Sequence, residues 1–364
     1  MSILFKLVST IQQTLFPALE KELAAPLGDK GELFVAVVEL TRPERMTDRF
    51  EWAGVGCPRK WRLPILLAFV AKAVWNFPTT RALLDRLAHD PTLRRLCGWE
   101  RAAEIPSEST FSRAFAEFAK SELPRQIHEA LIKEKLGEKL VGHLSHDATA
   151  IEAREKAAQK TEPEPKPKRR PGRPPKGEKR APRPLKRLEL QGGRTLEENL
   201  ADLPQVCDYG AKTFKGKNQC WRGYKAHLAT ADGDIPVALV LTSASLHDSQ
   251  AAIALMQMAA RRVTSLYDLL DSGYYSESIA AFSRRLGHVA IIEPKAMKNQ
   301  PAPEMEPARR VRYGERTAVE RVNSDLKDNH GGRTVRVRGG MKVAAHLMLG
   351  ILVVAVKGLV RLLE

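Results

Sequence analysis

The hydrophobic positions in the first third of the chain follow a helical period. Between residues 63 and 97, Leu, Ile, Val and Ala recur at the spacing that places them on one face of an α-helix. Breaks at residues 78–80 and at Asp90-Pro91 suit short turns between helices. Another helix is predicted to begin within residues 105–113, with Pro and Ser at its start. The pattern predicts an all-helical N-terminal domain over residues 1–136.

From residue 137 onward the hydrophobic runs become short and are typical of β-strands. A β-hairpin is predicted around the turn at Asp232-Gly233. Asp147 and Asp271 each follow a run at the place where a strand is expected to end. Because helical stretches separate the later runs, we expect an α/β domain over residues 137–364. The predicted strands cover residues 140–145, 221–230, 235–242, 264–270 and 288–294.

Neither a membrane span nor a secretory signal is expected. The apolar run at residues 347–356 is too short to cross a bilayer, so we predict a buried core helix there. Lys6 and Gln12-Gln13 interrupt the apolar N-terminus. The four cysteines are scattered without a CxxC pair, which favours reduced thiols in a cytoplasmic protein over a zinc module or a disulfide framework.

The charge balance indicates a polyanionic partner. The chain has 364 residues, and 59 Lys and Arg against 43 Asp and Glu give a net charge of +16. Such an excess points to nucleic acid first and to an acidic membrane second. Half of the excess lies between residues 155 and 190, where thirteen Lys and Arg face five Glu and eight prolines are found. We expect a basic, Pro-rich insertion without a packed core over residues 155–215.

Residues 169–177 within this insertion resemble an AT-hook. The Gly-Arg-Pro core of such a motif lies in the narrow minor groove of A·T tracts, which makes Arg173 a candidate DNA contact. Pro171 stands where the motif usually has Arg, so only half of the core is present. The alternative is a solvated basic linker that touches DNA phosphates without sequence preference.

The most informative stretch is the predicted helix over residues 313–327. Its spacing gathers Tyr313, Arg316, Glu320 and Lys327 on one narrow polar stripe. Apolar residues occupy the opposite face, and Gly314 weakens the first turn, so Tyr313 is expected at the helix entrance. A solvated charged face is the alternative interpretation. The apolar residues of the opposite face are Ala318, Val319, Val322 and Leu326.

The spacing Tyr-(2)-Arg-(3)-Glu-(6)-Lys resembles the signature helix of the DDE-type insertion-sequence transposases. The resemblance covers residues 100–360 and implies an RNase H-like catalytic domain with a mixed sheet. It implies that Glu320 is the third acid of a catalytic, metal-binding triad. Asp147, in an Asp-small-Thr context, resembles the first acid of that family, and Asp271, before Ser-Gly-Tyr, resembles the second. Asp268 is a rival to Asp271, although it lies within the predicted strand.

The same resemblance implies further contacts with DNA. Tyr313, Arg316 and Lys327 would hold the phosphates and bases of the transposon end. Lys225 resembles a basic position on the second strand of the family. The helix that begins at residues 105–113 is a candidate DNA-reading helix, offering Arg113, unless the N-terminal helices form a purely structural bundle. We expect His143 and His146 to be structural or to face DNA, because Mg²⁺ prefers oxygen ligands.

These observations predict a metal-dependent DNA transposase. Two divalent ions, either Mg²⁺ or Mn²⁺, would activate the attacking oxygen and neutralise the leaving oxygen. The reactions would be cleavage at the element ends and strand transfer into target DNA. The resemblance also implies a dimer on paired ends and a bacterial, nucleoid-associated location in the cytoplasm. A non-catalytic DNA-binding descendant and a metal-dependent nuclease are the alternatives.

Overall fold

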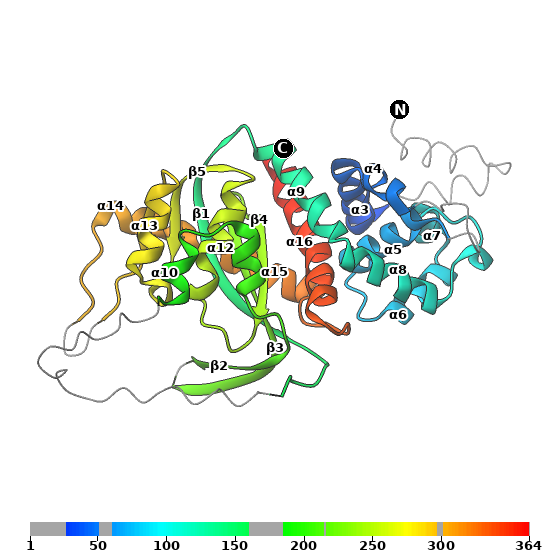
Figure 1. The fold of residues 1–364 in the computed structure, drawn as a ribbon. Coiled ribbons are helices and arrows are strands. Elements are labelled where there is room, and N and C mark those ends of the chain that lie inside the picture. The colour runs from blue at the N-terminus through cyan, green and yellow to red at the C-terminus, as the bar shows by residue number, and fades with distance from the viewer. Residues whose placement is uncertain (1–26, 51–59, 160–184, 215, 297–300, 364) are drawn as a thin grey trace, which may run out of the picture.

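The computed structural model describes residues 27–50, 60–159, 185–214, 216–296 and 301–363. A helical part and a part built on a β-sheet lie side by side, and the long C-terminal helix α16 (Gly340–Leu363) runs between them (Figure 1). One hydrophobic core extends from the N-terminal helices through α16 to the sheet. The core therefore continues across the predicted domain boundary, which lies at the turn after residue 136.

The N-terminal part is helical, as its hydrophobic period predicts. The Thr79 side chain accepts a hydrogen bond from the Ala82 N–H, and the Asp90 side chain accepts one from the Leu93 N–H. These caps begin two helices at the predicted breaks, because a side-chain oxygen satisfies an otherwise unpaired helical N–H. The helices are α3 (Gly28–Thr41), α4 (Glu44–Thr47), α5 (Arg62–Val74), α6 (Thr80–His89), α7 (Pro91–Leu96), α8 (Glu108–Lys120) and α9 (Leu123–Leu136).

The second part contains a mixed six-stranded sheet with the order β2-β3-β1-β5-β6, in which β4 also pairs with β3. β1 runs antiparallel to β3 and parallel to β5. Helices cover the sheet, and this α/β architecture is the expected RNase H-like fold. The strands are β1 (Leu140–Glu152), β2 (Asp208–Phe214), β3 (Lys217–Ala231), β4 (Ile235–Ser243), β5 (Thr264–Leu270) and β6 (Val289–Ile292), and the helices are α12 (Ser249–Ala260), α13 (Glu277–Arg285), α14 (Pro307–Tyr313) and α15 (Thr317–Asn329).

The first strand is longer than the sequence predicts. The expected strand ends at Ser145, whereas β1 continues to Glu152 and contains Asp147. The parallel pairing with β5 stops at Ser145, but the antiparallel pairing with β3 carries β1 on to Glu152. Because β3 supplies the missing hydrogen-bond partners, Asp147 lies within a strand and not after one.

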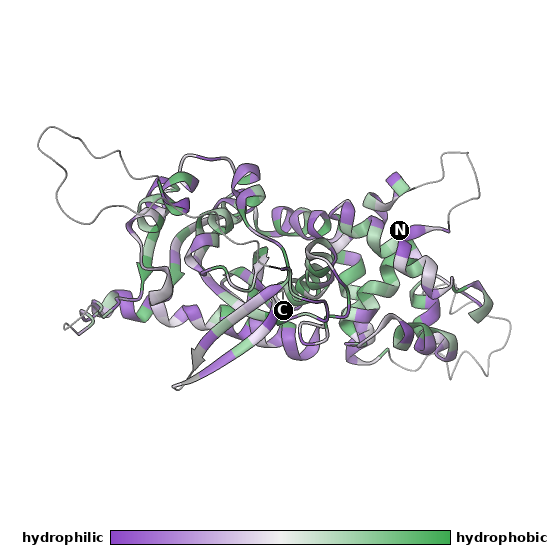
Figure 2. Ribbon diagram, turned by 60° about the horizontal axis from the view of Figure 1, so that its bottom comes forward, coloured by the Kyte–Doolittle hydropathy of each residue, from purple (hydrophilic) through white to green (hydrophobic). Residues whose placement is uncertain are grey.

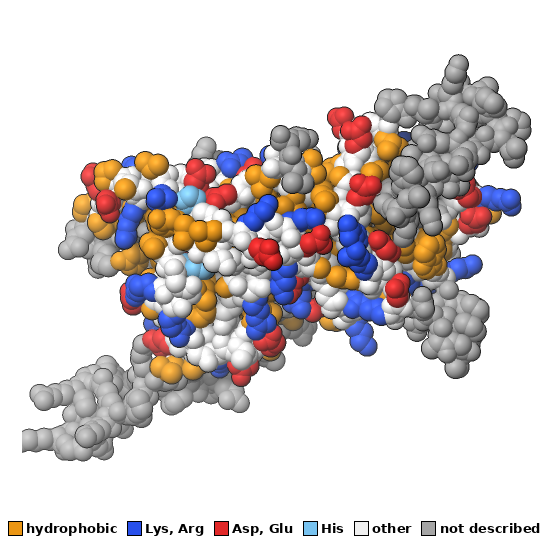
Figure 3. Space-filling model, turned by 90° about the horizontal axis from the view of Figure 1, so that it is seen from above, with side chains coloured by type: hydrophobic (Ala, Val, Ile, Leu, Met, Phe, Trp, Pro, Cys, Tyr) orange, Lys and Arg blue, Asp and Glu red, His pale blue; other side chains and the backbone are white. Residues whose placement is uncertain are grey.

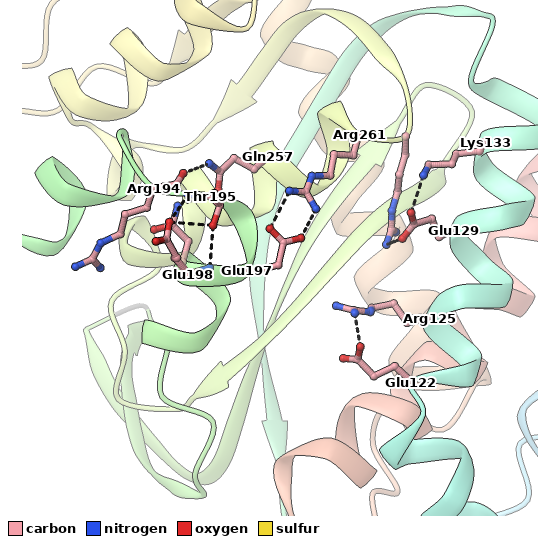
Figure 4. A network of polar contacts seen from close by, with 12 residues as sticks. Glu122, Arg125, Glu129, Lys133, Arg194, Thr195, Glu197, Glu198, Gln257 and Arg261 are labelled. Atoms are coloured by element: carbon pink, nitrogen blue, oxygen red, sulfur yellow. Dashed lines mark hydrogen bonds and ion pairs between the residues drawn. The ribbon is translucent and has the colours of Figure 1, made fainter.

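The predicted insertion is also shorter than expected. Residues 160–184, with Arg173 and the AT-hook-like motif, lie outside the described residues. Ordered elements occupy the end of the predicted range: α10 (Arg187–Gln191), α11 (Leu196–Asp202) and β2. The Asn199 side chain donates to Gln257 of α12 at 2.9 Å, and Glu197 pairs with Arg261 (Figure 4). These contacts with α12 hold the segment against the sheet domain.

Helix α16 has 24 residues and extends on both sides beyond the apolar run at residues 347–356. Within the described part of the chain it is the one helix long and apolar enough to cross a membrane. The most apolar 18-residue stretch of α16 is 83% buried inside the protein, where the helix packs on the N-terminal helices and on the sheet. The prediction of a core helix agrees with this burial.

Candidate active site

The strand register brings two of the predicted acids together. Ser145 of β1 pairs with Leu269 of β5 in the last parallel pair. Asp147 and Asp271 each follow that pair by two residues, so they emerge beside each other on adjacent strands. The charge of Asp271 raises the pKa of Asp147, as expected for neighbouring carboxylates. Two acids that are 124 residues apart in the sequence therefore lie together where the β1–β5 pairing ends.

Helix α15 carries the third acid to the same place. Val319 and Val322 are buried against the sheet, whereas Glu320 is exposed, as the predicted stripe requires. The Ser145 hydroxyl donates to the Glu315 carbonyl at 3.2 Å and the Asn323 amide donates to Asp147 at 3.1 Å. These two bonds dock the start of α15 on β1. Sequence reasoning did not identify Asn323, although it falls three residues after Glu320.

The entrance to this helix differs from the expectation. Tyr313 ends a separate helix, α14, and a 3₁₀ turn at Gly314–Arg316 joins α14 to α15. The Tyr313 hydroxyl donates to Glu293, just after β6, at 3.4 Å. The phenol therefore stands at the helix entrance with a second helix before it.

Arg316 lies among the three acids. Its guanidinium forms an ion pair with Glu320, and Nη1 is 3.9 Å from the Asp147 carboxylate. Burial by itself lowers the pKa of Arg316. The nearby Tyr313 and the carboxylates of Asp147, Glu320 and Asp271 outweigh this effect and raise the pKa overall. All three acids thus act on one cation.

Burial dominates the protonation of Asp147. Loss of solvent and, to a smaller extent, the charge of Asp271 raise the pKa of its carboxyl to about 6, against the lowering effects of Arg316 and the Ala148 N–H. The charge of Lys212, on β2, also lowers this pKa. A carboxyl with a raised pKa ionises less readily unless further positive charge lies nearby. Such a carboxyl is typical of a functional site.

The carboxylate oxygens of the three acids suit a hard divalent cation, but in this structure the guanidinium of Arg316 lies beside them. All three acids are carboxylates, the ligand class that Mg²⁺ prefers. In the described residues no three His, Cys, Asp or Glu side chains are grouped closely enough to hold a metal ion. Arg316 Nη1 and Asn323 Oδ1 are buried beside Asp147 and have no hydrogen-bond partner among the residues that the structure describes. These polar atoms leave the site incompletely satisfied, as expected where a further polar ligand binds.

Asp268 has a structural position instead of a place in the site. Its fully buried carboxylate accepts hydrogen bonds from Ser283 at 2.6 Å, from His146 at 2.9 Å and from His288 at 3.0 Å. Burial raises its pKa, and these donors outweigh burial and hold the pKa far below its usual value. His143 stacks on Tyr267 and bonds to Asp232. The two histidines that flank Asp147 along β1 are therefore held in polar and stacking contacts.

The predicted basic residues are divided between different surfaces. Lys225 donates to Asp248 and to the Leu246 carbonyl, both at 2.8 Å, and lies three positions from Leu228, the partner of Asp147. Because side chains alternate along β3, Lys225 faces away from the acids. Lys327 lies two turns beyond Glu320 on α15. Arg113 is exposed on α8, in the helical part.

A sheet of RNase H-like order with carboxylates gathered beside the β1–β5 pairing defines a class of nucleic-acid-processing enzymes. A family model described as Transposase DDE domain matches residues 142–355, and one described as Transposase domain (DUF772) matches residues 26–117. The first match covers more than half of the chain, and the chain belongs to the family of transposases with a DDE domain. No match was found among curated proteins or among solved structures.

Proposed function

We propose that Asp147, Asp271 and Glu320 are the catalytic acids of this transposase and that they hold Mg²⁺ or Mn²⁺. The observation that carries the proposal is the strand register that sets Asp147 beside Asp271, together with the hydrogen bonds of Ser145 and Asn323 that dock the helix of Glu320 on β1. A bound divalent cation would act as a Lewis acid on the phosphate under attack. The reactions proposed are DNA cleavage at the ends of the insertion element and strand transfer into target DNA.

Other residues of the chain would position the reacting groups. Asn323 would orient the Asp147 carboxylate through its 3.1 Å hydrogen bond. Arg316 would exchange its carboxylate partners for a DNA phosphate, which a guanidinium can bind through two parallel hydrogen bonds. Tyr313 and Lys327 would extend this contact along the transposon end.

The proposed partner is DNA, as terminal repeats and as target. The net charge of +16 supports this partner. We further propose a dimer on paired ends, a bacterial cytoplasmic location at the nucleoid, no membrane association, and DNA contacts by Arg113 and Arg173. Residues 1–136 would form the DNA-binding domain and residues 137–364 the catalytic domain.

The proposal is tested by cleavage of labelled DNA that carries the element's own terminal repeats, with Mg²⁺ or Mn²⁺. Asp147→Asn, Asp271→Asn and Glu320→Gln are each expected to reduce cleavage by more than about 100-fold while DNA binding persists, because loss of a ligand exceeds the 10–100-fold cost of losing an outer-shell partner. Glu277→Gln, at an exposed position of α13, is the matched control and should cut normally.

A non-catalytic DNA-binding function is the second candidate. The pairing of Arg316 with Glu320 and its approach to Asp147 favour it, because these contacts occupy groups that catalysis needs. Under this alternative the natural chain would bind the terminal repeats and leave them uncut with either metal. Cleavage that the three substitutions leave unchanged would refute the assignment of the acids.

A further inference from the structure

The segment between α15 and α16 presents three arginines from a fixed backbone. Arg333, Arg336 and Arg338 are exposed, whereas Val335 is 4% exposed and Val337 packs against the core. The alternation of Val335 to Arg338 has the two-residue period of an extended chain. We call residues 333–338 the arginine segment.

Hydrogen bonds fix both ends of the arginine segment. At its start, the Gly332 N–H donates to the Leu326 carbonyl at 2.9 Å. At its end, the Gly339 N–H donates to the Glu155 carboxylate at 2.9 Å, and the same carboxylate accepts a bond from the Tyr224 hydroxyl of β3. The segment is therefore tied to α15, to β3 and to the residues that follow β1.

The segment belongs to a cluster of cations in which two arginines lack anionic partners among the described residues. Among the described residues, neither Arg336 nor Arg338 has a hydrogen-bond or ion-pair partner, and Arg333 pairs with Asp328. Burial lowers the pKa of Lys327, and the charges of Arg333 and Lys212 lower it further, against the raising effects of Asp328 and Glu152. Mutual repulsion of this kind is relieved when an anion binds.

The position of this cluster relates it to the acids. Lys212 lies on β2 opposite Gln219 of β3, and its charge lowers the pKa of both Asp147 and Lys327. The β2–β3 hairpin projects from the body of the molecule, on the side where the chain enters α16 (Figures 1 and 2). On the face shown in Figure 3, basic side chains are interspersed with acidic ones. The arginine segment itself contains no acidic residue.

We propose that the arginine segment and Lys212 form a binding site for the phosphate backbone of duplex DNA next to the cleavage site. The inference rests on the proposed function, because it assigns the path of the DNA that the acids would cut. The exposed guanidinium groups suit phosphate contacts, which fix the register of a duplex without reading its sequence. The site would therefore hold the terminal repeat and an unrelated duplex alike.

The test compares Arg336→Gln/Arg338→Gln with Lys139→Gln/Arg284→Gln, a control that removes the same charge from other exposed positions. Binding to the terminal-repeat duplex and to a scrambled duplex is measured over a series of KCl concentrations. The slope of log K against log [KCl] is expected to fall by about 2 in the first variant, because each phosphate contact contributes about 0.9. The control should keep the natural slope, and Arg336→Lys/Arg338→Lys should largely restore it.

The outcomes separate this inference from the proposed function. If the natural chain cuts DNA but Arg336→Gln/Arg338→Gln keeps the natural salt slope, the inference is wrong and the catalytic assignment stands. The inference is equally wrong if the control loses as much slope as the variant. If the slope falls by about 2 only in the variant while the natural chain never cuts, the site is supported and the catalytic proposal fails.

Discussion

At the scale of the residue, Arg316 is the feature that governs the site. Its guanidinium is bound to Glu320, approaches Asp147 at 3.9 Å and is affected by the charge of Asp271. A cation in this position offsets the repulsion between carboxylates that burial and proximity create. A divalent cation bound by the same acids would have to compete with it.

Replacement of this internal cation should change metal affinity before any DNA is present. We expect Arg316→Gln to bind Mn²⁺ about tenfold more tightly than the natural chain in the absence of DNA, because about 1.4 kcal/mol of competing charge interaction is removed. Calorimetric titration with Mn²⁺ measures this affinity. Arg321→Gln is the matched control, since Arg321 lies on the same helix but pairs with Asp234. Equal affinities in Arg316→Gln and the natural chain would show that the guanidinium does not compete.

At the scale of the element, Asp268 joins the strands that carry the acids. The carboxylate is on β5, His146 is on β1 next to Asp147, and Ser283 is on α13. Three hydrogen bonds satisfy a fully buried charge, so removal of the carboxylate leaves these donors unpaired in the interior. The alignment of β1 with β5 depends on this contact between their side chains as well as on the backbone ladder.

Asp268→Ala is expected to lower the free energy of unfolding by about 3–5 kcal/mol, the cost of breaking a buried charged network. Urea denaturation followed by circular dichroism measures the change. Asp202→Ala is the control, because Asp202 is a half-exposed partner of Arg187, and its loss should cost at most about 1 kcal/mol. Similar losses in the two variants would mean that the Asp268 network adds no more than a surface ion pair.

At the scale of the whole molecule, buried neutral histidines link elements that lie apart in the sequence, and His128 links the two parts. His128 of α9 bonds to the Pro236 carbonyl of β4, and His346 of α16 bonds to the Gly331 carbonyl. Burial lowers the pKa of His128 to about 3 and those of His346 and His227 to about 4. In the unfolded chain the pKa of each of these histidines is near 6.5, so as the pH falls the unfolded chain binds the protons before the folded protein does. Stability is therefore lost as the pH falls below 6.5.

Between pH 7 and pH 5.5 the free energy of unfolding should fall by about 1 kcal/mol for each of these histidines. Asp147 acts in the opposite direction, because its raised pKa favours the folded state at low pH. His227→Gln isolates one contribution, since glutamine can keep the bond to Thr242. Chemical denaturation at several pH values should show a loss smaller by about 1 kcal/mol in the variant. An unchanged pH dependence in His227→Gln would contradict the argument.

The sequence by itself determined the features that depend on local spacing. From residue 317 onward the helix predicted at residues 313–327 became α15 with its apolar face buried, and the strand at 264–270 ends directly before Asp271, as predicted. Periodicity decides these features because each side chain needs only to face the core or the solvent. The same local pattern placed the β-hairpin at Asp232-Gly233, where Gly233 has a φ of +76° that a glycine adopts without strain.

Tertiary structure alone decided which distant residues meet. The length of β1 depends on β3 as a partner, and the meeting of Asp147 with Asp271 depends on the register with β5. The order of residues 187–214 depends on contacts with α12 and β3, and the alternation of side chains along β3 turns Lys225 away from the acids. Such pairings join positions far apart in the chain, and a local pattern of hydrophobic and polar residues does not encode them. The position of Arg316 among three acids is the clearest case, because it exists only once two strands and a helix have packed together.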